Sequence, residues 1–358
     1  MSPNAYLNRV ATAVPRYEVH RFFLGFAASM LAGDPRQRSI FGRMADRAGI
    51  ARRYSCFEPA DDPEGATLDA AGLFHRGAFP GTAKRMELYE AAAPQLAKQA
   101  VDRLLHGEDR SRITHLIVTT CTGFSAPGID LELVAHCGLR DVVERTIIGF
   151  MGCYAAINAL KLARHIVRSD PEARVLIVDV EICTLHLKET ADLEKLLSFC
   201  LWGDGCAAAL VTAEPHGLQL DTFCAVVAPQ ERQLMTWSIH DNGFDMVLSG
   251  EVPSAISETL GARAGEIFAD VAVGGVDLWV VHPGGRSVLD AVERALDLDA
   301  RALDVSRAVL HDYGNMSSAT VMFVIQKMLK QARPGQRGCA MAFGPGLTAE
   351  TMMFRTAG

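Results

Sequence analysis

Apolar positions along this chain recur in two spacings, one typical of strands and one typical of helices. Apolar runs of strand length occur at 114–120, 144–150, 173–181 and 206–213, and helical spacing occurs at about 84–105, 154–168 and 190–199. This alternation predicts an α/β fold in which helices cover the sheets. Nearer the start, Tyr6–Thr12 has a strand-like pattern, and the apolar run Phe22–Leu31 indicates a buried helix.

The same pattern starts again after Glu214–Gly217. Strands are expected near 218–226, 277–281 and 338–343, and helices near 252–269, 286–296 and 316–331. We therefore expect two halves, residues 1–217 and 218–358, although no sequence repeat is visible between them. Pro94 lies inside the first long predicted helix and predicts a kink there, because proline removes a backbone hydrogen bond.

A cysteine stands where a predicted strand passes into a predicted helix. Ile147–Phe150 is apolar, Gly152 breaks the run, and helical spacing begins directly after Cys153. A helix N-terminus favours an anion, so a thiol there loses its proton more readily and becomes a nucleophile. A buried and inert cysteine is the alternative for this residue taken alone.

Two later segments carry side chains that suit chemistry with a thiolate. His282 ends a predicted buried strand, and Asn315 stands just before the apolar helical run 319–329. A histidine can form an ion pair with a thiolate and move protons, and an asparagine can donate hydrogen bonds to a developing oxyanion. A core histidine and a helix cap are the alternatives, and sequence spacing does not place the three residues together.

Composition agrees with an enzyme that has a large core. The 358 residues are 49% apolar and 22% charged, and the net charge of −7 argues against a general nucleic-acid surface. Nine cysteines without a CxxC pair argue against a zinc ribbon or a disulfide framework, and they suit a reducing cytoplasm. No run reaches the roughly 20 apolar residues that a spanning helix needs, so we expect no stable membrane insertion.

Four separated motifs resemble those of the type III polyketide synthases, the chalcone synthase superfamily. They are GFMGCYAAINAL, VVHPGGRSVLDAVE, DYGNMSSATVMFVI and AFGPGLTAE, and the resemblance runs from about Leu7 to the C-terminus. It implies a thiolase-like fold, with two related halves in a five-layer αβαβα sandwich, and a homodimer. It also implies that Cys153 carries the acyl group, that His282 and Asn315 are its partners, and that no metal or bound cofactor is needed.

The resemblance also implies where coenzyme A binds. Arg43 and Arg47 match two of the family's three basic positions that contact CoA, and their spacing of four places them on one helix face. Ile40 occupies the third position, and Arg52 and Arg53 are candidates to replace its charge. An ordinary solvated helix face is the alternative for the arginines.

Further residues match the family's gate and cavity wall. Trp202 and Met246 match two gatekeeper phenylalanines between the CoA tunnel and the cavity. Phe343 lies in the AFGPG segment, Ala342–Gly346, which shapes the wall in this family. Ala342 departs from the usual glycine. Core filling is the alternative for these side chains.

Three small residues bear on the starter acyl group. Thr122, Ala126 and Cys183 resemble a set that opens a hydrophobic tunnel for a long acyl tail in bacterial alkylpyrone synthases. Burial of each tail methylene is worth about 0.8 kcal/mol. Tight core packing is the alternative. Trp237 matches a glycine in chalcone synthase and an aromatic residue in tetrahydroxynaphthalene synthase, so it argues against a ring-bearing starter and leaves a long alkyl or a malonyl starter.

The sequence therefore predicts a decarboxylative Claisen condensation of malonyl-CoA onto an acyl starter held on Cys153, followed by cyclisation to an alkylpyrone or an alkylresorcinol. The starter length, the number of extensions, the mode of ring closure and the carrier of the starter, CoA or a carrier protein, stay open. The alternatives are a malonyl-CoA-only synthase of tetrahydroxynaphthalene type, a ketoacyl-carrier-protein synthase III and, least favoured, a non-catalytic acyl-binding subunit. Expected partners are malonyl-CoA, an acyl-CoA and a second copy of the chain.

Overall fold

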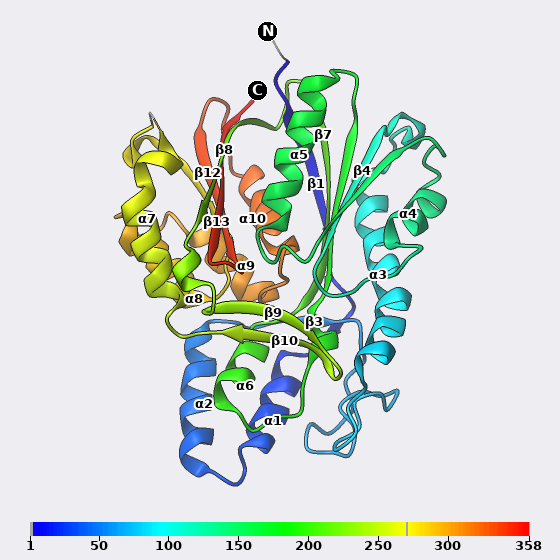
Figure 1. Cartoon of the computed structure of the whole chain (residues 1–358), viewed down its shortest axis with the longest axis vertical. Helices are drawn as coiled ribbons and strands as arrows, with labels where there is room; N and C mark the ends of the chain where they lie inside the picture. The colour runs from blue at the N-terminus through cyan, green and yellow to red at the C-terminus, as the bar shows by residue number, and fades with distance from the viewer. Residues whose placement is uncertain (1–2, 270, 358) are drawn as a thin grey trace.

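The computed structural model of the chain describes residues 3–269 and 271–357, and a nine-stranded mixed sheet forms its centre (Figure 1). The first-half strands lie in the order β1 (Tyr6–Ala13), β7 (Asp204–Thr212), β6 (Val175–Ile182), β4 (His115–Thr120) and β5 (Glu144–Gly149). The second-half strands lie in the order β8 (Leu218–Val227), β13 (Thr348–Thr356), β12 (Arg337–Gly344) and β11 (Leu278–Val281). The two sets join where β1 pairs with β8, over two residues of each strand.

Helices lie in three layers against these two sets of strands (Figure 1). The outer layer of the first half contains α3 (Thr82–Leu104) and α4 (Ile129–Cys137), the central layer contains α5 (Ala155–Ser169) and α10 (Ala319–Leu329), and the outer layer of the second half contains α7 (Val252–Phe268) and α8 (Arg286–Ala295). α9 (Asp304–Tyr313) packs against α10 and beside the edge strand β11. The resulting order of helix, sheet, helix, sheet and helix confirms the predicted five-layer α/β fold.

The two central helices position the candidate site. Most residues of α10 are buried, which explains why this helix is apolar apart from its last turns, where Gln326 and Lys327 lie. The buried face of α5 contains many alanines, so its backbone approaches both sets of strands closely. Both helices begin at the same level of the molecule, and Cys153 and Asn315 lie just before their first turns.

A smaller region lies at one end of the layers (Figure 1). It contains α1 (His20–Met30), α2 (Pro35–Ala48), α6 (Leu193–Phe199), and the short strands β2 (Tyr17–Glu18) and β3 (Tyr54–Ser55). The hairpin of β9 (Met235–His240) and β10 (Gly243–Leu248) crosses between this region and the layers. The region therefore closes one end of the space between the two halves.

One detail differs from the sequence predictions. The last helix begins at Ala319 rather than at 316, because Asn315–Ser318 form a turn. Pro94 lies inside α3, within the predicted helix. Ala342 and Phe343 lie near the end of β12, which matches the strand predicted near 338–343.

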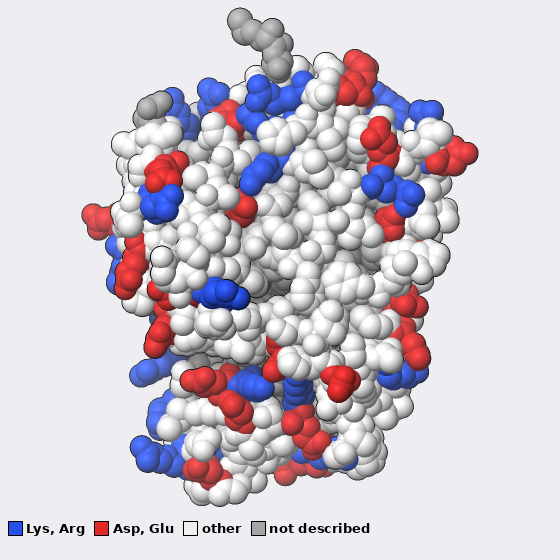
Figure 2. All heavy atoms as spheres, viewed as in Figure 1, with Lys and Arg blue, Asp and Glu red and all other residues white. Residues whose placement is uncertain are grey.

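The surface carries charges of both signs, gathered mainly around the margins of the face in Figure 2. The middle of this face is mostly uncharged, apart from a basic side chain beside the central hollow (Figure 2). Among the described residues, no helix combines the length and the apolar character that crossing a bilayer requires.

Candidate active site

The structure brings Cys153, His282 and Asn315 to the wall of one buried cavity between the two halves. Cys153 comes two residues before α5, in the first half. His282 directly follows β11, and Asn315 lies between α9 and α10, both in the second half. The sequence placed these residues at the ends of elements, and the fold makes those ends converge.

The turn that displays Cys153 has an unusual backbone. Phe150 and Gly152 both have positive φ angles, of 59° and 85°. A Cβ atom on Gly152 would lie 2.5 Å from Cδ of Pro345, in the loop after β12. The N–H of Gly152 also donates a hydrogen bond to Sγ of Cys121 at 3.0 Å. Glycine is therefore required here, both for the left-handed conformation and for the close approach of the second half.

Burial determines the resting state of the nucleophile. It raises the pKa of the Cys153 thiol to about 12, and hydrogen bonds from Ser317 and Asn315 oppose that rise. Sγ of Cys153 lies 3.9 Å from Oγ of Ser317. Desolvation therefore outweighs the helix N-terminus from which a thiolate was predicted, and Cys153 rests as a neutral thiol. Its proton must move to a neighbouring base before it can attack.

His282 can accept that proton. Burial lowers the pKa of His282 to about 3, so the ring is neutral at physiological pH. Within the described part of the chain, neither ring nitrogen has a hydrogen-bond partner. Buried polar atoms are normally paired, so two unpaired nitrogens facing a cavity indicate that their partners arrive with a substrate or through proton transfer.

The side chain of Asn315 is held in a fixed orientation. Its Oδ1 accepts a hydrogen bond from the backbone N–H of Ser317 at 2.8 Å, and its Nδ2 donates one to the carbonyl of Gly284 at 3.2 Å. One Nδ2 hydrogen remains for the cavity. The backbone N–H of Asn315 also donates to the carbonyl of Leu201, so the segment that carries Trp202 is attached directly to the site.

The predicted gate and wall residues surround the nucleophile. Trp202 and Met246 line both the cavity that holds His282 and an adjoining one that also holds Cys153, and Phe343 lines the first. Trp237 lines the adjoining cavity, and its Nε1–H donates a hydrogen bond to the carbonyl of Cys121 at 2.7 Å. This bond fixes the indole as one wall of the cavity.

The structure does not bring the three residues of the predicted acyl tunnel together. Thr122 and Cys183 line the cavity beside Cys153. The hydroxyl of Thr122 donates a hydrogen bond to Glu181 and accepts one from the backbone N–H of Ile182. Ala126 lies on the surface of the single chain and outside both cavities that contain Cys153. Within one chain, Thr122 and Cys183 therefore line the cavity of Cys153 and Ala126 does not.

A groove on the surface leads to this site, and it includes one of the two predicted CoA-binding arginines. Arg47 lines the groove together with Arg286 at the start of α8, and Nη1 of Arg286 donates a hydrogen bond to the carbonyl of Arg47 at 3.3 Å. Leu248, Gly284 and Val288 line both the groove and the cavity of His282, so the two are adjacent.

The other basic candidates lie elsewhere. Arg43 is exposed on α2, outside the lining of the groove, and donates a hydrogen bond to Ser39. Arg52 forms an ion pair with Asp312. Arg53 is only 2% exposed and binds His20 and backbone carbonyls, so it cannot replace the charge missing at Ile40 on the surface.

Sequence reasoning missed four residues of the site: Ser317, Met235, His186 and Arg286. Ser317 follows Asn315 within the recognised GNMSS segment, and its positive φ of 49° turns the chain at the cavity wall. Arg286 lies inside the motif HPGGRS. It was missed because a single surface arginine produces no periodic pattern in the sequence. His186 stacks on Phe244 with ring centroids 4.2 Å apart and supports Trp237 from behind.

No metal ligand set accompanies this site. Across residues 3–269 and 271–357, no three His, Cys, Asp or Glu side chains are grouped in a way that could hold an ion. The nine cysteines are free thiols.

Comparison of the chain with known proteins identifies a family that matches it over nearly its whole length. The chain matches "Chalcone and stilbene synthases, N-terminal domain" over residues 12–215 and the C-terminal domain of the same family over residues 219–358. It is 32% identical, over 365 residues, to "Alpha-pyrone synthesis polyketide synthase-like Pks18" of Mycobacterium tuberculosis (strain CDC 1551 / Oshkosh), which covers 98% of this chain and 91% of the relative.

Solved structures of polyketide synthases have the same fold. PKS-I from the brown alga Ectocarpus siliculosus superposes with a TM-score of 0.89 at 28% identity, covering 99% of each chain. The C-terminal type III polyketide synthase domain of Steely1 from Dictyostelium gives a TM-score of 0.90 at 23% identity, covering 99% of this chain and 100% of that one. The chain thus belongs to the chalcone and stilbene synthase family, and it is a type III polyketide synthase with a thiolase-like fold.

Proposed function

We propose that this polyketide synthase extends a medium or long fatty acyl group, held as a thioester on Cys153, with malonyl-CoA and releases an alkylpyrone. The observation that carries the proposal is the buried cavity that joins the Cys153 thiol, the two unpartnered nitrogens of His282 and the oriented amide of Asn315. The similarity to an α-pyrone polyketide synthase-like protein favours pyrone over resorcinol as the product.

Loading of the starter begins with a proton transfer. A nitrogen of His282 takes the proton from Sγ of Cys153, and the thiolate attacks the carbonyl carbon of the acyl-CoA. The resulting oxyanion accepts a hydrogen bond from Nδ2 of Asn315. As the C–S bond to CoA breaks, His282 returns the proton to the departing thiolate, which leaves as CoA-SH.

Extension uses the same two side chains, His282 and Asn315. Neutral His282 and Asn315 each donate a hydrogen bond to the thioester carbonyl of malonyl-CoA. The bond to the carboxylate breaks, CO2 leaves, and the electron pair remains as an enolate that these two donors stabilise. Because the cavity is buried, both hydrogen bonds are stronger than they would be in water. The enolate carbon then attacks the acyl carbonyl on Cys153 and frees its thiolate.

The groove beside the cavity suits the CoA portion of both substrates. Its two arginines, Arg47 and Arg286, provide positive charge for phosphate groups on a protein whose net charge is −7. Its inner end adjoins the cavity of His282 at Gly284 and Val288. A CoA thioester in this groove would extend its acyl end past Met246 and Trp202 to Cys153. Arg43 would contribute only at the exposed outer face of α2.

A product survey tests the proposed substrates. The purified protein is incubated with malonyl-CoA and acyl-CoA starters of increasing length, and the products are identified by mass spectrometry. Triketide and tetraketide pyrones from fatty starters are expected. If malonyl-CoA alone is converted and fatty starters are ignored, Trp237 closes the starter site and the enzyme resembles the tetrahydroxynaphthalene type. Use of a carrier-protein thioester in preference to acyl-CoA would favour the ketoacyl synthase alternative, and no CO2 release would favour a non-catalytic subunit.

A homodimer is proposed from an exposed apolar strip on one edge of the sheet. The edge strand β5 and its neighbouring segments leave Phe124, Leu131, Ile147 and Met151 exposed, each by more than a third of its surface. Large exposed apolar side chains grouped along an open strand edge are typical of a protein interface. A second copy of the chain would cover this strip.

A further inference from the structure

Two buried carboxyl groups lie on the face of β6 that packs against the central helices. Asp179 and Glu181 are two residues apart on this strand, so their side chains point the same way, and both are fully buried. Within residues 3–269 and 271–357, neither carboxyl has a basic side chain beside it to form an ion pair. The proposed loading and extension steps use neither group. Two unneutralised charges at this depth would be costly, so at least one of the carboxyls is expected to carry a proton.

Two hydroxyl groups connect these carboxyls. Oγ1 of Thr119 lies 2.6 Å from Oδ1 of Asp179 and 3.1 Å from Oγ of Ser318, and Oγ of Ser318 lies 2.6 Å from Oε1 of Glu181. This hydroxyl chain contains three contacts of hydrogen-bond length, but Thr119 and Ser318 supply only one hydrogen each. If both carboxyls were ionised, one contact would bring lone pairs together. The two carboxyls therefore share one proton.

The neighbours of the two carboxyls place the proton on Asp179. Oε2 of Glu181 accepts hydrogen bonds from the backbone N–H of Cys121 at 2.9 Å and from the hydroxyl of Thr122 at 3.0 Å. The oxygen of that hydroxyl accepts the N–H of Ile182, so its hydrogen is directed to Glu181. In the described part of the chain, Oδ2 of Asp179 has no partner. Because donors favour the ionised form of a carboxyl, the negative charge rests on Glu181.

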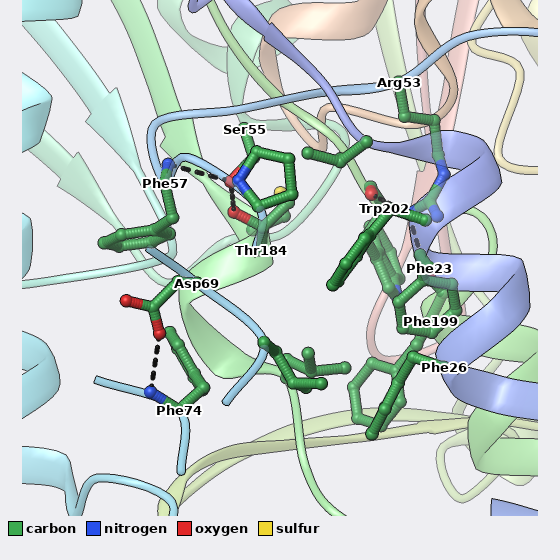
Figure 3. Close-up of a pocket in the computed structure, with 16 residues that line it drawn as sticks. Phe23, Phe26, Arg53, Ser55, Phe57, Asp69, Phe74, Thr184, Phe199 and Trp202 are labelled. Atoms are coloured by element: carbon green, nitrogen blue, oxygen red, sulfur yellow. Dashed lines mark hydrogen bonds between the residues drawn. The ribbon is translucent and has the colours of Figure 1, made fainter. Parts of the chain in front are cut away.

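Asp69 shows how this chain holds a buried carboxylate. Its two oxygens accept backbone hydrogen bonds, from Leu73 at 3.0 Å and from Phe74 at 2.7 Å, and the second of these bonds is drawn in Figure 3. Asp179 lacks such donors, because its oxygens have only the hydroxyl of Thr119 between them. This arrangement suits a carboxylic acid that donates its own hydrogen to Thr119.

Asp179 is the group of this cluster that changes its charge near neutral pH. Burial raises the pKa of Asp179 to about 7, the hydrogen bond with Thr119 opposes this rise, and the charge of Glu181 adds to it. Burial also raises the pKa of Glu181, but its hydrogen bonds oppose that rise. The other ionisable groups that face the two carboxyls are neutral, because burial raises the pKa of each: Cys206 beside both carboxyls, and Tyr89, Cys121, Cys153 and Cys183 beside Glu181.

We propose that Asp179 is a positioning residue of the catalytic site, which holds the proton of the pair and thereby orders the hydroxyl chain at the start of α10. Ser318 directly follows the turn that presents Asn315 to the cavity, and its hydroxyl donates to Glu181. Loss of the proton leaves the contact between Thr119 and Ser318 without a hydrogen and places two like charges in one dry cluster, so the turn loosens. This inference rests on the role of Asn315 in the proposed function.

The variant Asp179→Asn tests where the proton lies. Its amide can donate to Thr119 as the protonated acid does, but it does not ionise. From pH 6 to pH 9, kcat for CO2 release from malonyl-CoA should fall at least tenfold in the wild type and less than threefold in Asp179→Asn. The pKa values of Cys153, about 12, and of His282, about 3, lie outside this range. KM at pH 6 should be the same in both proteins, because Asp179 does not line the CoA groove.

Two further variants complete this test. Glu181→Gln replaces an oxygen that accepts N–H and O–H donors, so kcat should fall at least tenfold already at pH 6. Asp102→Asn is the matched control, because this partly exposed carboxyl on α3 pairs with Arg110 outside the hydroxyl chain, and it should keep the alkaline fall of the wild type. A tolerated Glu181→Gln beside a damaged Asp179→Asn would place the proton on Glu181 and overturn the assignment. An alkaline fall that persists in Asp179→Asn would overturn it too.

Thermal unfolding gives a readout that does not depend on catalysis. The native pKa of Asp179, about 7, lies above its ordinary value of 3.8, so this group destabilises the wild type progressively as the pH rises from about 4 to about 7. The Tm of the wild type should therefore fall more between pH 5 and pH 8 than the Tm of Asp179→Asn does. Equal falls would overturn the shared proton. The expected difference, together with no CO2 release from malonyl-CoA by the wild type at any pH, would support the shared proton and overturn the proposed function itself.

Discussion

At the scale of single residues, the site depends on what burial does to two neutral groups. Exclusion of water disfavours the charged form of both side chains. It raises the pKa of the Cys153 thiol to about 12 and lowers the pKa of the His282 ring to about 3. Neither residue is charged at rest, and charge appears when a proton passes between them. The enzyme thus carries a nucleophile that is inactive until its partners and substrate are in place.

Removal of the thiol should separate the two half-reactions. In Cys153→Ala, condensation should fall by roughly three orders of magnitude or more, because no acyl carrier remains. Decarboxylation of malonyl-CoA should persist at a reduced rate, since His282 and Asn315 are unchanged. Labelled CO2 and polyketide product are measured in parallel. Cys137→Ala, which removes a buried thiol at the end of α4 that lines neither cavity of Cys153, is the control and should retain both activities.

The alkylation rate of Cys153 should report its ionisation. Because its pKa is raised well above that of an ordinary thiol, the thiolate fraction at any pH below about 12 should rise about tenfold per pH unit. The rate of iodoacetamide modification at Cys153, followed by peptide mapping, should therefore climb steeply from pH 7 to pH 9 without a plateau. A rate that is flat across this range would mean that the resting enzyme already holds a thiolate–imidazolium pair.

At the scale of elements, the proposed CoA groove receives positive charge from two helices of different halves. α2 contributes Arg47, and the start of α8 contributes Arg286, whose guanidinium reaches the carbonyl of Arg47. The two positive charges lie together because the fold brings α2, at one end of the layers, beside α8. The proposed binding of CoA depends on this contact.

Loss of Arg286 should weaken binding of CoA without changing the chemistry. Arg286→Ala should raise KM for malonyl-CoA about fivefold to thirtyfold, because the guanidinium interacts equally with ground and transition states. The value of kcat should stay within twofold. Malonyl-N-acetylcysteamine, which lacks phosphates, should show no change in KM.

Arg294 provides the control on the same helix. It is exposed near the end of α8, away from the groove, so Arg294→Ala should leave KM for malonyl-CoA unchanged. A fall in kcat with unchanged KM in Arg286→Ala would contradict a role in CoA binding.

Most of the elements could be predicted from the sequence, but their contacts could not. Strands β4, β6 and β7 and helix α10 are largely apolar runs, and α5 has its apolar residues at helical spacing, so local sequence patterns identify all of them. The β9–β10 hairpin was missed because its exposed residues lack a sustained apolar alternation. The position of Ala126 outside the cavity and the approach of Arg286 to Arg47 depend on long-range packing, which leaves no mark on local spacing.

At the scale of the whole molecule, the exposed apolar strip along β5 should govern assembly. Ile147 is 42% exposed on this edge strand, and Ile147→Lys places a charge in the proposed contact between two copies. At micromolar concentration the wild type is expected to sediment as a dimer, and the variant should sediment as a monomer.

Met44 is the control for this substitution. It is 47% exposed on α2, in the region at one end of the layers, and Met44→Lys should leave the sedimentation coefficient unchanged. A wild type that sediments as a monomer throughout the same concentration range would refute the proposed dimer.

The short pairing of β1 with β8 joins two bodies that each hold part of the catalytic set. The first half carries a thiol, and the second half carries the imidazole and the amide that would make it reactive. During biosynthesis, the first half emerges before the second, so an incompletely folded chain has the Cys153 thiol but neither His282 nor Asn315 beside it. The proposed condensation therefore requires that the C-terminal strands have closed the sandwich, and catalytic activity reports complete folding.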